Sequence, residues 1–180
     1  MKKKFFIFCL LLFVFCLTGC GAQKTVDPAP KEEKSNRPVA KGIAFETKEL
    51  EFYLPEGFLK SPTNGMLGVF EFYTGEWKDA GPTGIDCMIL LDSIDESFSI
   101  EDYVQTSAPA LAEGISLEKK TINDSTWYVG ESEKVHYYYA SFRDHKYEVK
   151  ITLNGEDNDL YDQTIQMFEK TMYLEELDEK

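Results

Sequence analysis

Residues 135–142 read Val135-His136-Tyr137-Tyr138-Tyr139-Ala140-Ser141-Phe142, a run in which apolar and aromatic side chains occupy both alternating sets of positions. Successive side chains of a β-strand point to opposite faces of the sheet, so both faces of this strand are expected to be covered. The stretch therefore predicts a central strand in a sheet that has other elements packed on each side.

The segments around this run predict a four-stranded antiparallel meander. In the segment that follows it, apolar residues alternate with polar ones, which is typical of a strand with one buried face. Turn residues at Asn123-Asp124 and Asp144-His145 separate neighbouring strands. The predicted strands are Ile115–Ile122, Thr126–Glu131, Lys134–Phe142 and Lys146–Leu153.

Four more strands are predicted upstream, and they are separated by two loops. The loops are Ser61–Gly65, which is polar, and Thr74–Gly84, which contains three glycines and Pro82 and is expected to be long and exposed. The predicted strands are Ile43–Phe45 and Leu50–Leu54 on either side of Thr47-Lys48, then Met66–Tyr73 and Ile85–Asp92.

Two stretches have the period of a helix. Ser99 with Asp102 resembles a capping box and opens the first helix, which Pro109 is expected to kink or shorten and Gly114 to end. Its expected apolar stripe is Ile100, Tyr103, Val104, Ala108 and Leu111; that of the second helix, Asn158–Met172, is Tyr161, Ile165, Phe168 and Met172. The predicted fold class is α+β, an antiparallel β-sheet flanked by helices.

A family resemblance adds to this prediction. The apolar strand ending in Leu54-Pro55-Glu56-Gly57-Phe58 resembles the opening of the PsbP/Mog1-like superfamily, and the similarity in the order of elements covers about Ile43 to Tyr173. It implies a three-layer α/β/α sandwich, mostly non-enzymatic roles as accessory subunits, assembly factors or binding modules, and no common active site. Where the family usually ends in a Ser-Phe pair, this chain has Thr171-Met172-Tyr173.

The N-terminus predicts export and lipid attachment. Three lysines precede an apolar run from Phe5 to Leu17, which is the layout of a secretory signal peptide. The following Leu17-Thr18-Gly19-Cys20 resembles the lipobox of bacterial lipoproteins, which implies cleavage between Gly19 and Cys20 and acyl chains such as palmitate on Cys20. An ordinary signal peptide with an incidental cysteine, or a retained anchor helix, is the alternative.

The chain is therefore expected to divide into four parts. These are a lipoprotein signal peptide (1–19), a lipidated cysteine with a disordered, proline-containing tether (20–41), a single globular domain (42–177) and a short tail (178–180). The expected location is the extracytoplasmic face of the cell membrane, to which the N-terminal lipid holds the protein. The sequence leaves open whether the envelope is Gram-positive or Gram-negative.

Charge restricts the class of partner. Without residues 1–20, which contain three lysines and no acid, 16 Lys and Arg stand against 32 Asp and Glu. Such a polyanion is repelled by nucleic acids and by anionic lipid surfaces. The acidity suits cationic partners or divalent ions, or simply keeps an exported domain soluble.

The titratable side chains give no strong catalytic pattern. Cys87 is the one cysteine outside residues 1–20 and is expected to be a small buried hydrophobe rather than a nucleophile. His145 is expected in a solvated turn, and His136 in a partly buried position. Two histidines without partner cysteines give no zinc motif, and the sequence has neither a nucleophile elbow nor a phosphate-binding glycine loop.

Two weaker candidates for binding remain. Trp77 lies in the long loop and is either an exposed aromatic for a partner or a lid folded back on the sheet. Glu156-Asp157-Asn158-Asp159 with Asp162 has oxygen ligands suited to Ca²⁺, but it lacks the central glycine and distal glutamate of an EF-hand, so ordinary capping of the next helix is the competing interpretation. No metal site or cofactor is predicted.

The favoured function is thus a membrane-anchored, non-catalytic binding or accessory module for an envelope protein or a small ligand. A purely structural envelope protein would differ only in having no specific partner. The alternative is a small cell-envelope hydrolase or metal-assisted enzyme that uses His136 with nearby carboxylates, and it requires His136 to lie in a cleft beside a carboxylate.

Overall fold

The computed structural model describes residues 41–78, 81–92, 94 and 97–175 of the chain. Its largest element is an antiparallel sheet of seven strands in the spatial order β3-β4-β7-β11-β10-β9-β8. The strands are β3 (Leu59–Lys60), β4 (Val69–Tyr73), β7 (Ile85–Leu91), β8 (Glu118–Ile122), β9 (Ser125–Glu131), β10 (Val135–Phe142) and β11 (His145–Leu153). The predicted central strand is confirmed, because β10 pairs with β9 on one side and with β11 on the other.

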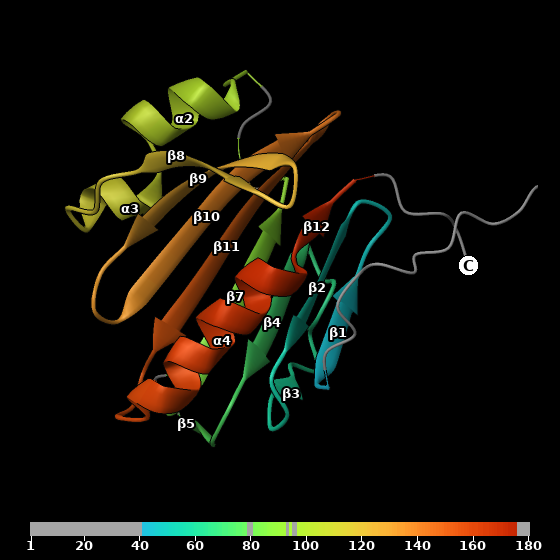
Figure 1. Ribbon diagram of the computed structural model, residues 1–180, viewed down its shortest axis with the longest axis vertical. Helices are drawn as coiled ribbons and strands as arrows, with labels where there is room; N and C mark the ends of the chain where they lie inside the picture. Colours follow the sequence, from blue (N-terminus) through green and yellow to red (C-terminus); the bar gives the residue numbers. More distant parts are fainter. Residues whose placement is uncertain (1–40, 79–80, 93, 95–96, 176–180) are drawn as a thin grey trace, which may run out of the picture. The chain divides into compact units, whose positions relative to one another are not determined.

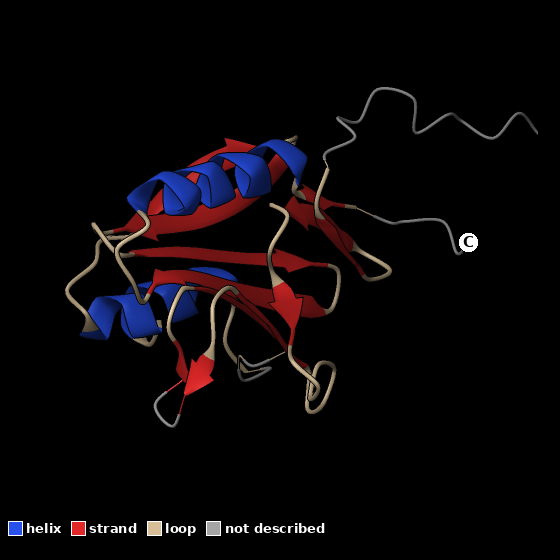
Figure 2. Cartoon of the chain, turned by 90° about the horizontal axis from the view of Figure 1, so that it is seen from below, coloured by secondary structure: helices blue, strands red, loops and turns tan. Residues whose placement is uncertain are grey.

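Helices lie on both faces of this sheet. Helix α4 (Asn158–Thr171) lies on one face, whereas α2 (Ile100–Thr106) and α3 (Pro109–Ala112) cover part of the other, as Figures 1 and 2 show. The predicted class, an α+β fold with an antiparallel sheet flanked by helices, is therefore confirmed.

A second sheet shares the α4 side of the molecule. It contains β1 (Ile43–Glu46), β2 (Leu50–Leu54) and β12 (Tyr173–Leu174) in the order β1-β2-β12, and it lies beside α4 in Figure 1. The pairing of the first two strands is as predicted, but a separate sheet is not, and β12 was not expected at all. A two-residue strand has no periodicity of its own, so only its pairing with Leu50 and Glu51 defines it.

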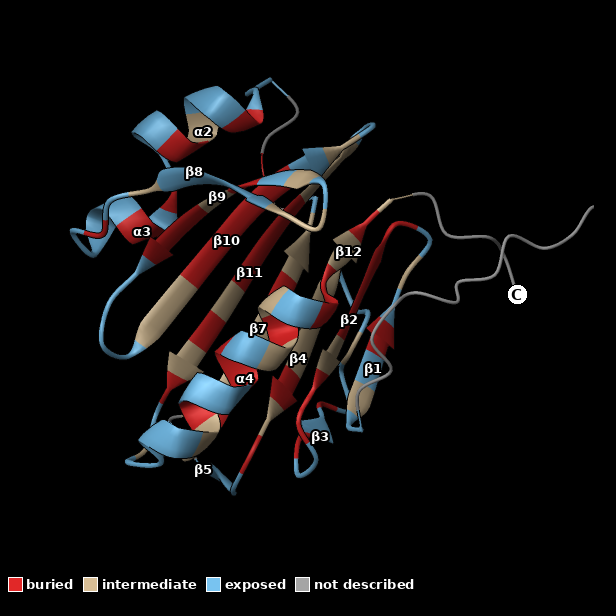
Figure 3. Cartoon of the chain, in the orientation of Figure 1, coloured by how far each residue is buried: buried red, intermediate tan, exposed pale blue. Residues whose placement is uncertain are grey.

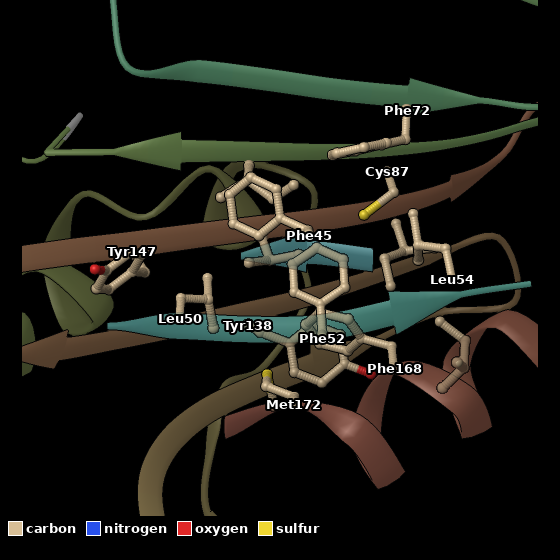
Figure 4. Close-up of a cluster of buried hydrophobic side chains, with 14 of the residues drawn as sticks. Phe45, Leu50, Phe52, Leu54, Phe72, Cys87, Tyr138, Tyr147, Phe168 and Met172 are labelled. Atoms are coloured by element: carbon tan, nitrogen blue, oxygen red, sulfur yellow. The ribbon is translucent and has the colours of Figure 1, made fainter. Parts of the chain in front are cut away.

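The α4-side core joins these parts through aromatic rings. Phe45 of β1 contacts Phe70 and Phe72 of β4, with ring centroids 5.0 and 5.8 Å apart. Phe168 of α4 lies 4.9 Å from the Phe52 ring of β2 and 4.8 Å from the Tyr138 ring of β10 (Figure 4). Figure 3 shows the buried positions running along the central strands and the sheet-facing side of α4. Cys87 is fully buried in this core, as predicted.

Polar bonds also join the small sheet to the rest. The Tyr147 hydroxyl on β11 donates to Glu49 Oε2 in the β1–β2 turn at 2.9 Å. Thr171, the last residue of α4, accepts from the Tyr53 amide of β2 through Oγ1, also at 2.9 Å. Strand β12 pairs with β2 only at Leu50 and Glu51. The end of α4 therefore provides the acceptor for a backbone N–H further along β2, at Tyr53.

The opposite core is smaller and lies under α2 and α3. The Tyr137 and Tyr139 rings of β10 stack with centroids 5.9 Å apart, and Ile100 and Val104 of α2 are buried in the same cluster. Ser99 caps α2 by accepting from the Asp102 amide at 3.0 Å, as the capping box predicts.

Pro109 ends the first helical segment more completely than a kink would. It occupies the first turn of a separate helix, α3, where its missing N–H costs nothing. The direction of the chain changes between the two helices, so Ala110 is buried and Leu111 is 37% exposed. The predicted place of Leu111 in the apolar stripe is therefore wrong.

Several predicted boundaries also differ from the structure. The β10–β11 turn is Arg143-Asp144, because Phe142 pairs with His145, so His145 is the first residue of β11. Strand β4 begins at Val69 rather than Met66, and β8 begins at Glu118 rather than Ile115. The predicted long loop contains a short hairpin, β5 (Trp77–Lys78) with β6 (Gly81–Pro82).

Both edges of the large sheet are protected. Beyond the two residues of β3, the loop at 61–65 satisfies the outer edge of β4: Ser61 N donates to Glu71 O, Asn64 Oδ1 accepts from Glu71 N, and Gly65 N donates to Val69 O. At the other edge, β8 places charged, exposed residues, among them Lys119 and Lys120. Covered or charged edges are the usual devices that prevent unwanted strand pairing.

Candidate functional site

His136 lies on the α4 side of β10 and is mostly enclosed. Its side chain is 16% exposed, and its Nδ1 is 3.4 Å from the Tyr138 hydroxyl and 4.0 Å from Glu131 Oε2. Burial lowers its pKa, and Glu131 only partly opposes this effect, so the ring is neutral at pH 7. The arrangement is that of a partly buried histidine whose ring nitrogen is next to a tyrosine hydroxyl and a carboxylate.

The other predicted candidates do not assemble a site. His145 Nδ1 lies 3.2 Å from Asp92 Oδ2 at the surface. Asp157 caps α4 by accepting from the Leu160 amide at 3.0 Å, which is the ordinary role that competes with Ca²⁺ binding. Among the residues that the structure describes, no three His, Cys, Asp or Glu side chains gather to hold a metal ion.

The predictions for the N-terminal segment concern another part of the chain. Gly19, Cys20, residues 21–40 of the tether and the tail at 178–180 lie outside the described residues. Within the described ranges, no helix combines the length and apolarity needed to cross a bilayer.

The structure instead draws attention to the sheet face that carries α2 and α3. These helices cover the β10 end of that face, and strands β4, β7 and β11 extend beyond them. The strand register places two rows of side chains there, Tyr73–Asp86–Thr152 and Glu71–Met88–Lys150. All six side chains are partly exposed. We call these six residues the open patch.

Two carboxylates lie on neighbouring strands of the open patch. Asp86 is paired with Tyr73 and Glu71 with Met88, so the two acids are diagonal neighbours across β4 and β7. Burial raises the pKa of Asp86 to about 7; the negative charge of Glu71 adds to the increase and Lys150 opposes it. Burial also raises the pKa of Glu71.

Asp86 has no partner among the described residues. Its Oδ1 is enclosed and receives no hydrogen bond. Buried carboxylate oxygens are normally hydrogen-bonded, because an unsatisfied one loses its hydration without compensation. An exception of this kind is a candidate functional position when the residue also has a strongly shifted pKa and lies on an accessible surface.

Lys150 is directed to another acid. Its Nζ donates to Glu113 Oε1 at 3.1 Å and lies 4.9 Å from the centre of the Tyr137 ring. The Tyr137 hydroxyl donates to the same Glu113 oxygen at 2.7 Å, and this bond is the main cause of a lowered Glu113 pKa. Lys150 is thus held by the α3 end of the face and forms no ion pair with Asp86 or Glu71 in the described structure.

Trp77 stands at the other end of the open patch. Its ring contacts the Tyr73 ring edge-on, with centroids 5.4 Å apart, and 53% of its surface remains exposed. The β5–β6 hairpin that carries it projects from the same side of the sheet as α2 and α3 (Figure 2). Trp77 therefore packs on the sheet at one edge and presents the rest of its ring to solvent, which combines the two predicted alternatives.

A shallow hollow of about 450 Å³ lies at the far end of the sheet, between the α3–β8 connection and strands β8 and β9. Its charged lining includes Glu118, Lys120 and Glu131, and Lys120 is 4.0 Å from Glu131. Lys120 pairs with Glu131, and none of the described lining side chains has a buried polar atom without a hydrogen bond, as Asp86 does.

Comparison with known proteins yields structural likenesses only. No known protein family matches the sequence, and no curated protein does. A crystal structure from Bacteroides thetaiotaomicron is similar at 15% identity and a TM-score of 0.42; the match covers 78% of this chain and spans about half, 51%, of that protein. A solution structure of cyanobacterial PsbP from Synechocystis is similar at 12% identity and a TM-score of 0.49, with 81% of this chain and 99% of that protein covered.

Proposed function

We propose that this chain is a lipid-anchored, extracytoplasmic binding module that recognises an envelope protein or a small ligand through the open patch and Trp77. One observation carries the proposal: the half-exposed Trp77 ring stands on Tyr73, whose cross-strand neighbour is the unpartnered Asp86. Exposed aromatic anchors beside polar groups are typical of binding surfaces. The N-terminal signal and lipobox pattern support the proposed location.

The Trp77→Ala variant tests the binding surface. The full-length protein would be captured from detergent-solubilised envelopes of the cell that makes it, after mild cross-linking and with and without Ca²⁺. We expect recovery of a specific partner to fall about tenfold or more in the variant, because an aromatic anchor is lost. The free energy of unfolding should change by less than about 1 kcal/mol, because the ring is only half covered.

Phe98→Ala is the matched control, since Phe98 is also a partly exposed aromatic (39%) but precedes α2 and lies outside the open patch. It should recover the partner as the wild type does. Equal loss in both variants, or no loss in Trp77→Ala, would contradict the proposed surface.

The Cys20→Ser variant tests the anchor. Cells that produce the full chain and are fed an alkyne analogue of palmitate should label the wild type and not the variant, because serine has no thiol for the thioether. Cys16→Ser, which changes a cysteine of the apolar run, should keep the label. Label that persists in Cys20→Ser, or an unlabelled wild type, would instead favour an ordinary signal peptide or a retained helix.

A further inference from the structure

We infer that the open patch binds an organic cation, an ammonium or guanidinium group carried by a basic side chain of the partner or by a free amine. This inference rests on the proposed function and specifies the chemistry of the ligand at the same site. It follows from three features of the patch: an uncompensated acid pair, a lysine held elsewhere, and an aromatic and aliphatic wall.

The acid pair is the first feature. Glu71 and Asp86 are diagonal neighbours, and neither carboxylate has a hydrogen bond or an ion pair with any residue that the structure describes. Two adjacent, partly buried carboxylates repel each other and are poorly hydrated, so both are less stable in the free protein than in water. A cation beside them would relieve the repulsion, and its N–H groups would form charge-assisted hydrogen bonds with the carboxylate oxygens that solvent reaches.

The second feature is the position of Lys150. It is the cross-strand neighbour of Met88 and could in principle neutralise the pair, but Glu113 and the Tyr137 ring hold its ammonium group at 3.1 and 4.9 Å. The negative charge therefore remains available to a ligand from outside.

The wall around the acids favours an organic cation over a metal ion. Tyr73 lies next to Asp86, Trp77 contacts Tyr73, and Met88 lies between Glu71 and Lys150. Aromatic faces attract ammonium and guanidinium groups, and an aliphatic side chain packs against the methylene stem that carries them. Ca²⁺ needs six to eight oxygen ligands, whereas the described part of the patch offers only two carboxylates.

Calorimetric titration of the full-length protein in detergent tests this inference. The probes are Nα-acetylated arginine amide (below, arginine amide), its uncharged isostere Nα-acetylated citrulline amide (below, citrulline amide), a twelve-residue Gly-Ser peptide containing two arginines, and CaCl₂. We expect arginine amide to bind and citrulline amide to bind at least about tenfold more weakly. Asp86→Asn and Glu71→Gln should each weaken arginine amide about tenfold, whereas Asp144→Asn, in the exposed β10–β11 turn, should change affinity less than about twofold.

The same titrations also distinguish a cation carried by a protein partner from a free amine. A peptide that binds about tenfold more tightly than arginine amide indicates a protein partner, and equal affinities indicate a free amine; both results support the inference. Equal binding of citrulline amide, no effect of Asp86→Asn and Glu71→Gln, or binding of Ca²⁺ alone would overturn it. If capture of the partner depends on Trp77 but not on Asp86, the inference of a cationic ligand is wrong and the proposed function still stands.

Proton release gives a readout that a merely structural role would not produce. With burial and Glu71 raising the pKa of Asp86 to about 7 and Lys150 opposing them, a bound cation would favour the ionised form and release a proton. The affinity for arginine amide should therefore fall several-fold from pH 8 to pH 6, and this fall should be absent in Asp86→Asn.

Discussion

Replacing Phe168 with alanine is expected to lower the free energy of unfolding by about 3–5 kcal/mol. The ring is fully buried and contacts Phe52 of the small sheet and Tyr138 of the large one, with centroids 4.9 and 4.8 Å away. Its removal would leave a cavity where α4 and both sheets meet, and the rings of Phe52 and Tyr138 can fill that space only partly. Urea denaturation followed by near-ultraviolet circular dichroism measures the change.

Phe98→Ala is again the control, because it removes the same atoms from a partly exposed position. Its effect should stay within about 0.5–1 kcal/mol. A loss below about 1.5 kcal/mol in Phe168→Ala would show that the packing of α4 against the two sheets does not depend on this contact.

Replacing Asp86 with asparagine is expected to stabilise the protein at pH 8 by about 2 kcal/mol and to change its stability little at pH 4. Burial and the charge of Glu71 raise the pKa of Asp86 from an ordinary 3.8 to about 7, so folding favours the protonated carboxyl. Its contribution to stability is therefore fully present below about pH 4 and is lost as the pH rises through 7. Asparagine stays neutral at every pH, so the variant keeps the stability that the wild type loses when Asp86 ionises.

Urea denaturation of wild type and variant at the two pH values checks this prediction, with Asp144→Asn as the surface control. The full shift would correspond to about 4 kcal/mol, and solvent at the open patch reduces it. A gain of equal size at both pH values, or a loss at pH 8, would contradict the assignment of the shifted carboxyl.

A surface that gains stability when it loses its ligand-binding group is characteristic of functional sites. The same substitution should therefore separate two properties of the protein, by raising the unfolding free energy and lowering affinity for a cation. At a position with a purely structural role, a substitution would change the free energy of unfolding and the affinity in the same direction.

Much of the fold could be predicted from sequence because its signals are local. Val135–Phe142 marked the strand covered on two sides, Asn123-Asp124 marked a turn in which both residues adopt positive φ, and the Tyr161–Met172 stripe marked the buried side of α4. Each depends on residues within a few positions of one another.

The missed features depend on partners that are distant in the chain. Alternation in Leu50–Leu54 shows that one face is covered, but not whether the strand joins the large sheet or a separate one. β12 exists only because its two residues meet β2. The exposure of Leu111 follows from a change of direction at Pro109 that the helical period does not encode.

Only part of the candidate site could be singled out from the sequence, for the same reason. Trp77 stood out as an aromatic residue in a glycine-rich loop, and the structure places it at the open patch. Glu71 and Asp86 are each a single acid in an otherwise apolar strand, a pattern that is typical of an ordinary solvent-exposed face. Only the pairing of β4 with β7 places them side by side, and only the contact of Lys150 with Glu113 leaves them uncompensated.

The protected edges of the large sheet affect how copies of the protein would associate on a membrane. A domain tethered to a membrane, as proposed here, meets copies of itself at a local concentration far higher than in free solution. The 61–65 loop occupies the backbone groups of β4, and the lysines of β8 repel a like strand, so crowded copies cannot readily join sheet to sheet. Lateral packing could then become dense without fibrous polymerisation, and the face beside Trp77 would stay open to its ligand.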